Sequence, residues 1–118
     1  MLRPGDVVAA SRGIFDHVGI VTDAGTVISN SGRRGRVVEE TLNQFAAGSS
    51  IRRVGYLGAL PPHVVVARAR SQLGRRYNLL ASNCEHLVHY AHGLPRRSPQ
   101  LVAAGVAAGL ALLVRWNQ

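Results

Sequence analysis

Two strand-forming segments joined by a very short connection constrain the fold of this chain most. Residues 14–22, IFDHVGIVT, and residues 26–30, TVISN, are rich in β-branched and aromatic side chains, which favour strands. The residues between them are Asp23, Ala24 and Gly25. Three residues with glycine in the last place suit a hairpin loop that ends in the left-handed conformation. We therefore expect an antiparallel β-hairpin.

The length of this turn decides which side chains share a face of the hairpin. With a three-residue turn, Gly19 lies opposite Ser29, and His17 shares its face with both of them. Ser29 is then the diagonal neighbour of His17. A two-residue Ala-Gly turn would put alanine at positive φ and would swap the faces, so that Asn30 took the position beside His17. We expect the three-residue turn and keep Asn30 as the alternative.

The rest of the chain completes an α+β fold, with an antiparallel β-sheet packed on helices. After the two prolines at 61–62 the apolar period changes from that of a strand to that of a helix, and the run 46–50 is expected as a loop. Further strands are expected at 6–10, 36–40 and 51–57, and helices at 63–73 and 84–92, which end at Gly74 and Gly93.

Size and charge limit the classes of partner. A chain of 118 residues allows one domain with a modest core. All 14 basic residues are arginines, scattered as pairs, and aromatic residues make up 5%. This pattern does not favour nucleic acid, and the net charge of +8 favours an anionic membrane surface as partner. The sequence opens without a basic and apolar leader, so we expect a cytoplasmic protein.

The single cysteine, Cys84, lies at the start of the second predicted helix. Asn83 is a suitable N-cap, and Cys84 shares a helix face with Leu87, Val88 and Ala91. A lone thiol is often a small buried hydrophobe. At a helix start, however, backbone N–H groups and the dipole stabilise a thiolate. This position makes Cys84 a candidate nucleophile.

A cysteine nucleophile needs a base, which is usually an imidazole. Of the five histidines, His63 follows the two prolines, and His86 points away from Cys84 on the same helix. His89 and His92 fall in the last helical turn, where we expect them on the polar face. His17 lies within an apolar strand and is the candidate base. The alternative for His17 is a core histidine bonded to a backbone carbonyl.

Four segments, PGDVV, DHVGIV, TVIS and NCEHLVHYAHGLPR, together resemble the lecithin:retinol acyltransferase (LRAT)-like family, which includes the H-rev-type phospholipases and acyltransferases. The family motif NCEHF stands here as NCEHL, and the resemblance covers about residues 3–100. It implies a circularly permuted papain-like fold of the NlpC type. It also implies a reaction in which the cysteine takes an acyl group from a phospholipid as a thioester and passes it to water, an amine or an alcohol. We expect no cofactor and no metal.

The resemblance also assigns roles to residues. Cys84 matches the nucleophile and His17 matches the base. From its position at the helix start, the N–H of Cys84 is the expected oxyanion donor. A second histidine of the family, which orients the first, is replaced here by Ser29. A hydroxyl carries no charge and orients an imidazole more weakly than a histidine would. Ser29 is the expected third group, and Asn30 is held in reserve by analogy with Cys-His-Asn enzymes.

The chain ends in an apolar segment. We divide it into an LRAT-like catalytic domain at 1–100 and a C-terminal hydrophobic helix at 101–118. Residues 101–114 are uncharged and apolar, and as a helix they would span about 21 Å against a hydrocarbon core of about 30 Å. This segment is a candidate membrane anchor by resemblance to H-rev-type relatives, and a helix packed on its own domain is the alternative.

Three functions are compatible with these features. The first is a thiol-dependent acyltransferase or phospholipase that acts on phospholipid acyl esters. The second is an NlpC-type cysteine amidase or peptidase. The third is a weakly active or non-catalytic membrane-associated domain, which the serine at position 29 favours.

Overall fold

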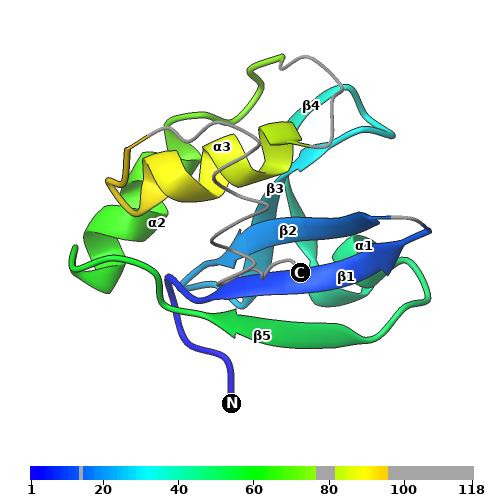
Figure 1. Ribbon diagram of the computed structural model, residues 1–118, viewed down its shortest axis with the longest axis horizontal. Helices are drawn as coiled ribbons and strands as arrows, with labels where there is room; N and C mark the ends of the chain where they lie inside the picture. The colour runs from blue at the N-terminus through cyan, green and yellow to red at the C-terminus, as the bar shows by residue number, and fades with distance from the viewer. Residues whose placement is uncertain (14, 77–81, 96–118) are drawn as a thin grey trace.

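The structure, a computed structural model of the 118-residue chain, describes residues 1–13, 15–76 and 82–95. Five strands form one antiparallel sheet in the order β4-β3-β2-β1-β5, with helices packed on it (Figure 1). The α+β class is thereby confirmed. In chain order the elements are β1 (Val7–Arg12), β2 (Phe15–Val21), β3 (Thr26–Ser31), β4 (Arg36–Thr41), α1 (Leu42–Ala46), β5 (Ile51–Gly55), α2 (Pro62–Arg70) and α3 (Ser82–Ala91).

The β2–β3 hairpin has the three-residue turn that the sequence predicts. The amide of Thr22 donates to the carbonyl of Thr26 at 2.9 Å, and Gly25 ends the loop with a φ of +76°. Gly19 is paired with Ser29 across the two strands. The two-residue alternative is therefore wrong, because it would have shifted this pairing by one residue.

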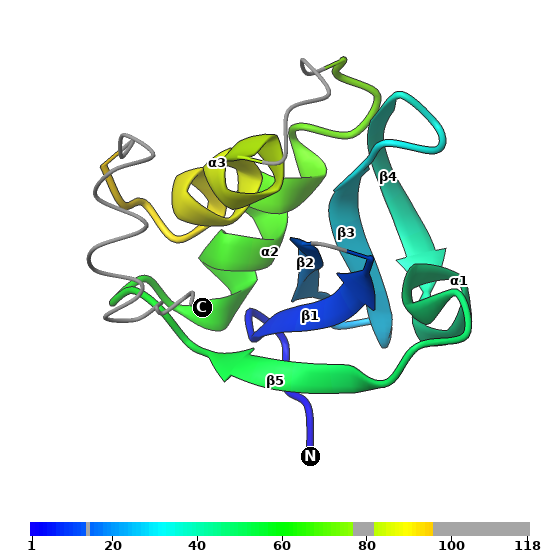
Figure 2. The same cartoon turned by 45° about the vertical axis from the view of Figure 1, so that its right-hand side comes forward.

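Each face of the sheet carries its own apolar cluster. The helices α2 and α3 cover one face, and α1 lies on the other side of the sheet (Figure 2). Ile20 and Ile28 pack under α2 and α3, whereas Val21 and Val27 pack on Phe45 of α1. The α3 residues in the first cluster are Leu87, Val88 and Ala91, which confirms the buried helix face predicted from their spacing.

The α1 helix was not predicted from the sequence. Thr41 is its N-cap and forms a capping box with Gln44: the Gln44 amide donates to Oγ1 of Thr41 at 3.1 Å, and Oε1 of Gln44 accepts from the Thr41 amide at 2.9 Å. This Thr-x-x-Gln spacing is a recognised start signal for helices. The short helix buries Phe45 completely, and Phe45 becomes important for the candidate site.

The α3 helix ends as predicted at Gly93. Its φ is +71°, and two backbone hydrogen bonds close the last turn, from the Gly93 amide to the Tyr90 carbonyl at 3.0 Å and from the Leu94 amide to the His89 carbonyl at 2.8 Å. This pair of bonds is the Schellman motif, which satisfies carbonyls at the end of a helix.

Helix α2 ends at Arg70, three residues earlier than expected. The chain then makes turns and reaches β4, where the Gly74 amide donates to the Val37 carbonyl at 2.9 Å and the Val37 amide donates to the Arg75 carbonyl at 3.0 Å. Pairing with the edge strand β4 thus replaces the last helical turn.

No helix among the described residues is long and apolar enough to cross a membrane. The predicted hydrophobic helix at 101–118 lies outside the described residues. The division of the chain at residue 100 and the circular permutation therefore stay predictions.

His92 is buried inside the fold, so the expectation that it lies on a polar helix face is wrong. It follows the last residue of α3, its exposed fraction is 1%, and its ring meets the Tyr56 ring edge-on at 4.7 Å. The Gly58 amide donates to Nδ1 at 3.2 Å, which leaves Nε2 to carry the proton and donate to the Gly5 carbonyl at 2.8 Å. His92 therefore ties the start of the chain to the segment after β5.

The neutral form of His92 is the form that these bonds require. Burial lowers the pKa of His92 below 6.5, although the bond to Gly5 and the charge of Asp6 oppose this shift. The unfolded chain then binds a proton that the folded chain excludes. Stability is therefore fully present above the unfolded pKa and decreases as the pH falls below it.

We predict that His92→Gln flattens this dependence of stability on pH. Glutamine can accept and donate hydrogen bonds but does not titrate, so the free energy of unfolding should change less between about pH 7.5 and 5 than in the wild type. Urea unfolding at several pH values in this range measures the change. His63→Gln is the matched control, since His63 is exposed. An unchanged slope in His92→Gln would contradict this role.

Candidate active site

The strands β2 and β3 bring His17 and Ser29 together. His17 has an exposed fraction of 6% and Ser29 of 0%. Nε2 of His17 and Oγ of Ser29 lie 3.1 Å apart in a buried hydrogen bond. The diagonal placement predicted from the hairpin register is therefore confirmed.

An aromatic ring from α1 fixes the imidazole from a second direction. The rings of Phe45 and His17 are stacked, with centroids 4.9 Å apart and an angle of 24° between their planes. Phe45 was not among the site residues predicted from the sequence. The capping box around Thr41 was the signal that could have revealed its helix.

Gly19 allows this packing. A Cβ atom at this position would lie 2.5 Å from Cγ1 of Val27, 2.8 Å from the carbonyl oxygen of Ile28 and 3.2 Å from Cε1 of Phe45. The region beside Gly19 is thus filled by neighbours on β3 and α1. A side chain at this position would push Phe45 away from the imidazole.

The backbone of Cys84 lies in the first turn of α3, as predicted. The helix begins at Ser82, so Asn83 is inside the first turn and is not the N-cap, a difference of the size usual for helix boundaries. The side chain of Cys84 lies outside the described part of the structure. First-turn amides lack partners within their helix, and the dipole there favours negative charge.

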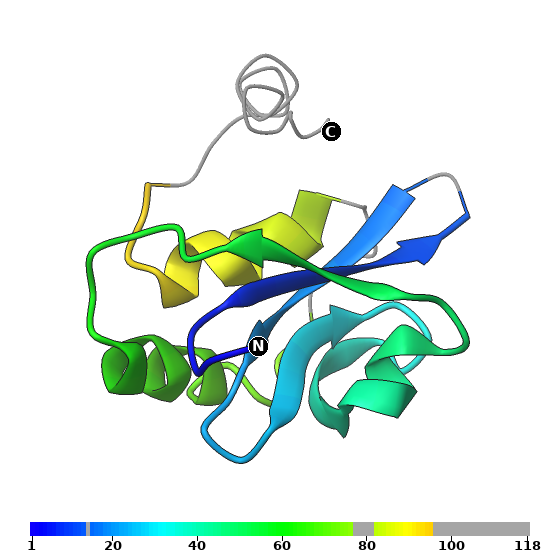
Figure 3. The same cartoon turned by 90° about the horizontal axis from the view of Figure 1, so that it is seen from below.

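The first turn of α3 and His17 lie at the same end of the sheet. In Figures 1 and 3, α3 starts near the end at which β2 begins, and it contacts both β2 and β3. However, α3 and the side chain of His17 lie on opposite faces of the sheet. Val18 packs toward the cluster under α3, whereas His17 stacks on Phe45 on the opposite face. The structure thus joins His17 to Ser29 and places the Cys84 backbone at the same end.

The remaining candidate residues from the sequence are Asn30 and three further histidines. Asn30 is buried and paired with Val37 on β4, and it alternates with Ser29 along β3 so that it faces away from His17. His63 is exposed, and His86 and His89 are half-buried on α3.

Several carboxylates form ion pairs that link elements of the fold. Asp6 binds Arg53 at 3.0 Å and Glu39 binds Arg70 at 3.2 Å. Burial raises the pKa of Asp6, but the hydrogen bonds and charges of Arg53 and Arg3 together outweigh it and the net pKa is lowered. The hydrogen bond from Arg70 likewise lowers the pKa of Glu39. Both groups are thus held ionised as structural partners. No group of three or more metal-ligating side chains occurs in the described part of the chain.

Comparison with known proteins identifies the family of the chain. The family model described as lecithin retinol acyltransferase matches residues 1–93, which include His17, Ser29 and Cys84. Comparison with individual curated proteins gives no significant match. Because the family match spans most of the 118 residues, the chain belongs to the lecithin retinol acyltransferase family, whose activities are in general those of acyltransferases and phospholipases.

Proposed function

We propose that the protein is a thiol-dependent acyltransferase or phospholipase that acts on phospholipid acyl esters in the cytoplasm, at an anionic membrane surface. The observation that carries the proposal is the buried hydrogen bond between His17 and Ser29, found at one end of the sheet together with the first turn of α3. A histidine oriented by a second group is the arrangement that activates a cysteine nucleophile.

The proposed reaction has two steps. His17 takes the proton of the Cys84 thiol, Sγ attacks the ester carbonyl carbon, and the first tetrahedral intermediate collapses to a thioester. The lysophospholipid leaves with the proton that His17 returns to its oxygen. Water, an amine or an alcohol then attacks the thioester and gives its proton to His17, and the proton returns to the sulfur when the acyl product leaves. The Cys84 amide is the proposed donor to the oxyanion.

Ser29 selects the nitrogen of His17 that does this chemistry. Its hydroxyl engages Nε2, and when it accepts the Nε2 proton the imidazole is held in the tautomer with a basic Nδ1. We therefore assign proton transfer with Cys84 to Nδ1. Stacking on Phe45 restricts rotation of the ring, so Ser29 does not have to position it alone.

One observation favours a second candidate, a membrane-associated domain with weak or no catalysis. Ser29 is neutral, and it stands where the family pattern noted above has a second histidine. A hydroxyl oxygen is a weaker hydrogen-bond acceptor than an imidazole nitrogen, so Ser29 stabilises an imidazolium less than a second histidine would. The NlpC-type amidase or peptidase is disfavoured, because the family match points to lipid substrates.

We predict an acyl adduct on Cys84 after incubation with phosphatidylcholine vesicles. Intact-mass spectrometry of the quenched protein should show one added acyl group, and peptide mapping should place it on Cys84. The variants Cys84→Ser and His17→Gln should show no thioester, and circular dichroism establishes that each is folded. The absence of an adduct from the wild type, even under rapid quenching and with short-chain esters, would favour the non-catalytic candidate.

We predict that Ser29→Ala lowers kcat about fivefold with little change in KM, because it removes one neutral hydrogen bond worth about 1 kcal/mol. Asn30→Ala is the matched control. It removes a buried amide on the opposite face of β3, so it should lower stability but leave kcat per folded molecule unchanged. A large loss in Asn30→Ala beside full activity in Ser29→Ala would show that the third group has been assigned wrongly.

A further inference from the structure

Two glycine–arginine segments that are distant in sequence lie side by side in the fold. Residues 32–36 read GRRGR and residues 74–76 read GRR. The first contains the β3–β4 turn, and the second follows the turns after α2. The backbone bonds of Val37 to Gly74 and Arg75 join them along β4. We name their side chains the arginine rim, which consists of Arg33, Arg34, Arg36, Arg75 and Arg76.

The arginine rim gathers five positive charges at one edge of the sheet. All five arginines are exposed. Oε2 of Glu40, whose side chain is 4% exposed, lies 3.5 Å from Arg33 and 3.3 Å from Arg34. Without Arg75, the other four arginines and this carboxylate carry a formal charge of +3.

Three arginines outside the rim form ion pairs with carboxylates of their own. Arg52 and Arg53 each have a carboxylate partner, in Asp16 and Asp6. Arg70 has two, in Asp23 and Glu39. Four rim arginines, namely Arg33, Arg34, Arg36 and Arg76, beside the one carboxylate of Glu40 therefore differ from these ion-paired positions.

The backbone of the rim is ordered and open to solvent. The Gly35 amide donates to the carbonyl of Ser31 at 2.8 Å, and the Arg34 amide donates to the Ser31 hydroxyl at 3.1 Å. A Cβ atom added at Gly32, Gly35 or Gly74 would meet nothing within 4 Å. A broad surface can therefore approach the rim closely.

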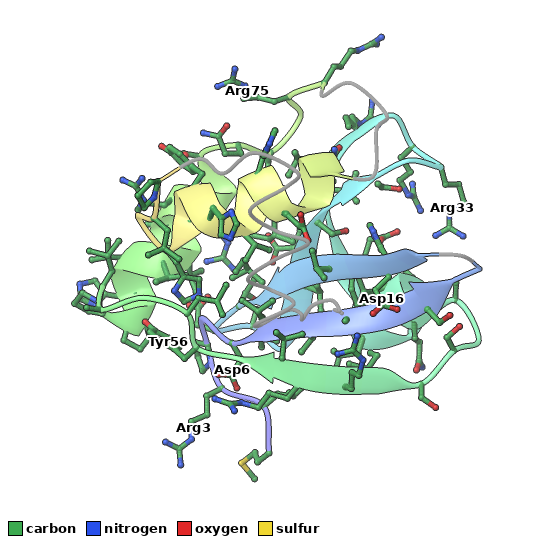
Figure 4. All side chains as sticks on the ribbon, viewed as in Figure 1. Arg3, Asp6, Asp16, Arg33, Tyr56 and Arg75 are labelled. Carbon is green, nitrogen blue, oxygen red and sulfur yellow. The ribbon has the colours of Figure 1, made fainter. Side chains whose placement is uncertain are left out.

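The rim lies beside the proposed catalytic end of the molecule. In Figures 1 and 2 the β3–β4 turn and the segment after α2 are next to the N-terminal end of α3, where the backbone of Cys84 lies. Figure 4 shows Arg33 and Arg75 projecting outward from this region. A surface bound to the rim would therefore face the start of α3.

We propose that the arginine rim binds the phosphate groups of anionic phospholipids and turns the N-terminal end of α3 toward the bilayer. This inference rests on the proposed function and adds the surface that recognises the membrane. Guanidinium groups bind phosphate oxygens in pairs of hydrogen bonds. The eight described residues of the two segments contain no aromatic side chain on which bases could stack, and the family acts on lipids. Lipid is therefore favoured over nucleic acid.

The test measures partition onto vesicles of phosphatidylcholine with phosphatidylglycerol, and onto vesicles of phosphatidylcholine alone. The variant Arg36→Gln/Arg76→Gln should weaken binding to the anionic vesicles roughly 20-fold to 30-fold, at about fivefold per arginine near the surface. The control Arg3→Gln/Arg68→Gln removes the same charge from positions outside the rim, near the start of the chain and beside Tyr90 at the C-terminal end of α3, and should weaken binding much less, since charges more than about 10 Å from the lipid are screened. Circular dichroism establishes that both variants are folded.

Three outcomes would overturn the inference. Equal losses in the two double variants would mean that net charge alone drives binding. Equal binding of the wild type to both vesicle types would exclude recognition of anionic lipid. Tighter binding to a duplex or single-stranded oligonucleotide than to anionic vesicles, lost in Arg36→Gln/Arg76→Gln, would make the rim a nucleic-acid surface.

The experiment distinguishes failure of this inference from failure of the proposed function. Partition is measured without turnover, on Cys84→Ser as well as on the wild type. If no acyl adduct formed on Cys84 but the rim variant lost binding, the catalytic proposal would fail and the membrane surface would stand.

Discussion

The hydrogen bond from the Thr22 amide to the Thr26 carbonyl closes the three-residue turn between β2 and β3, and the candidate site depends on the register that this turn sets. Because side chains alternate along a strand, a shift of one residue would exchange the two faces of β3. Ser29 would then face α2 and α3, and Asn30 would lie beside His17. One local bond thus decides which polar side chain meets the imidazole.

The same alternation separates the two halves of the proposed active site. Val18 and Ile20 pack toward α2 and α3, whereas His17 and Gly19 face α1 and Phe45. A contact between Cys84 and His17 therefore has to form around the end of the sheet and not through it. The first turn of α3 lies at that end, so the proposed contact depends on how the helix start and the start of β2 are placed there.

Local signals in the sequence predicted much of this arrangement. The glycine at position 25 indicated the turn and hence the register, and the spacing of Leu87, Val88 and Ala91 indicated the buried face of α3. The capping box of Thr41 and Gln44 was equally local but was overlooked, and with it the helix that carries Phe45. These features are determined within a few residues, so a single sequence can reveal them.

Features formed by distant segments could not be predicted in this way. His92 lies just past a helix end, where sequence periodicity no longer indicates burial, and its partners Gly5 and Gly58 come from other parts of the chain. The backbone pairing of residues 74–76 with β4, which accompanies the early end of α2, also joins distant segments and could not be predicted from the local sequence.

The arginine rim follows from this joining. In the sequence its two segments are separate groups of arginines, and the fold brings them together along the edge strand β4. Like charges held at one edge repel each other, and this repulsion opposes folding unless counter-charges approach. One buried carboxylate, Glu40, relieves part of it within the chain. The exposed guanidinium groups of Arg36 and Arg76 can draw counter-charge from outside the protein, and a layer of lipid phosphates beside the start of α3 would supply it where the proposed reaction needs its substrate.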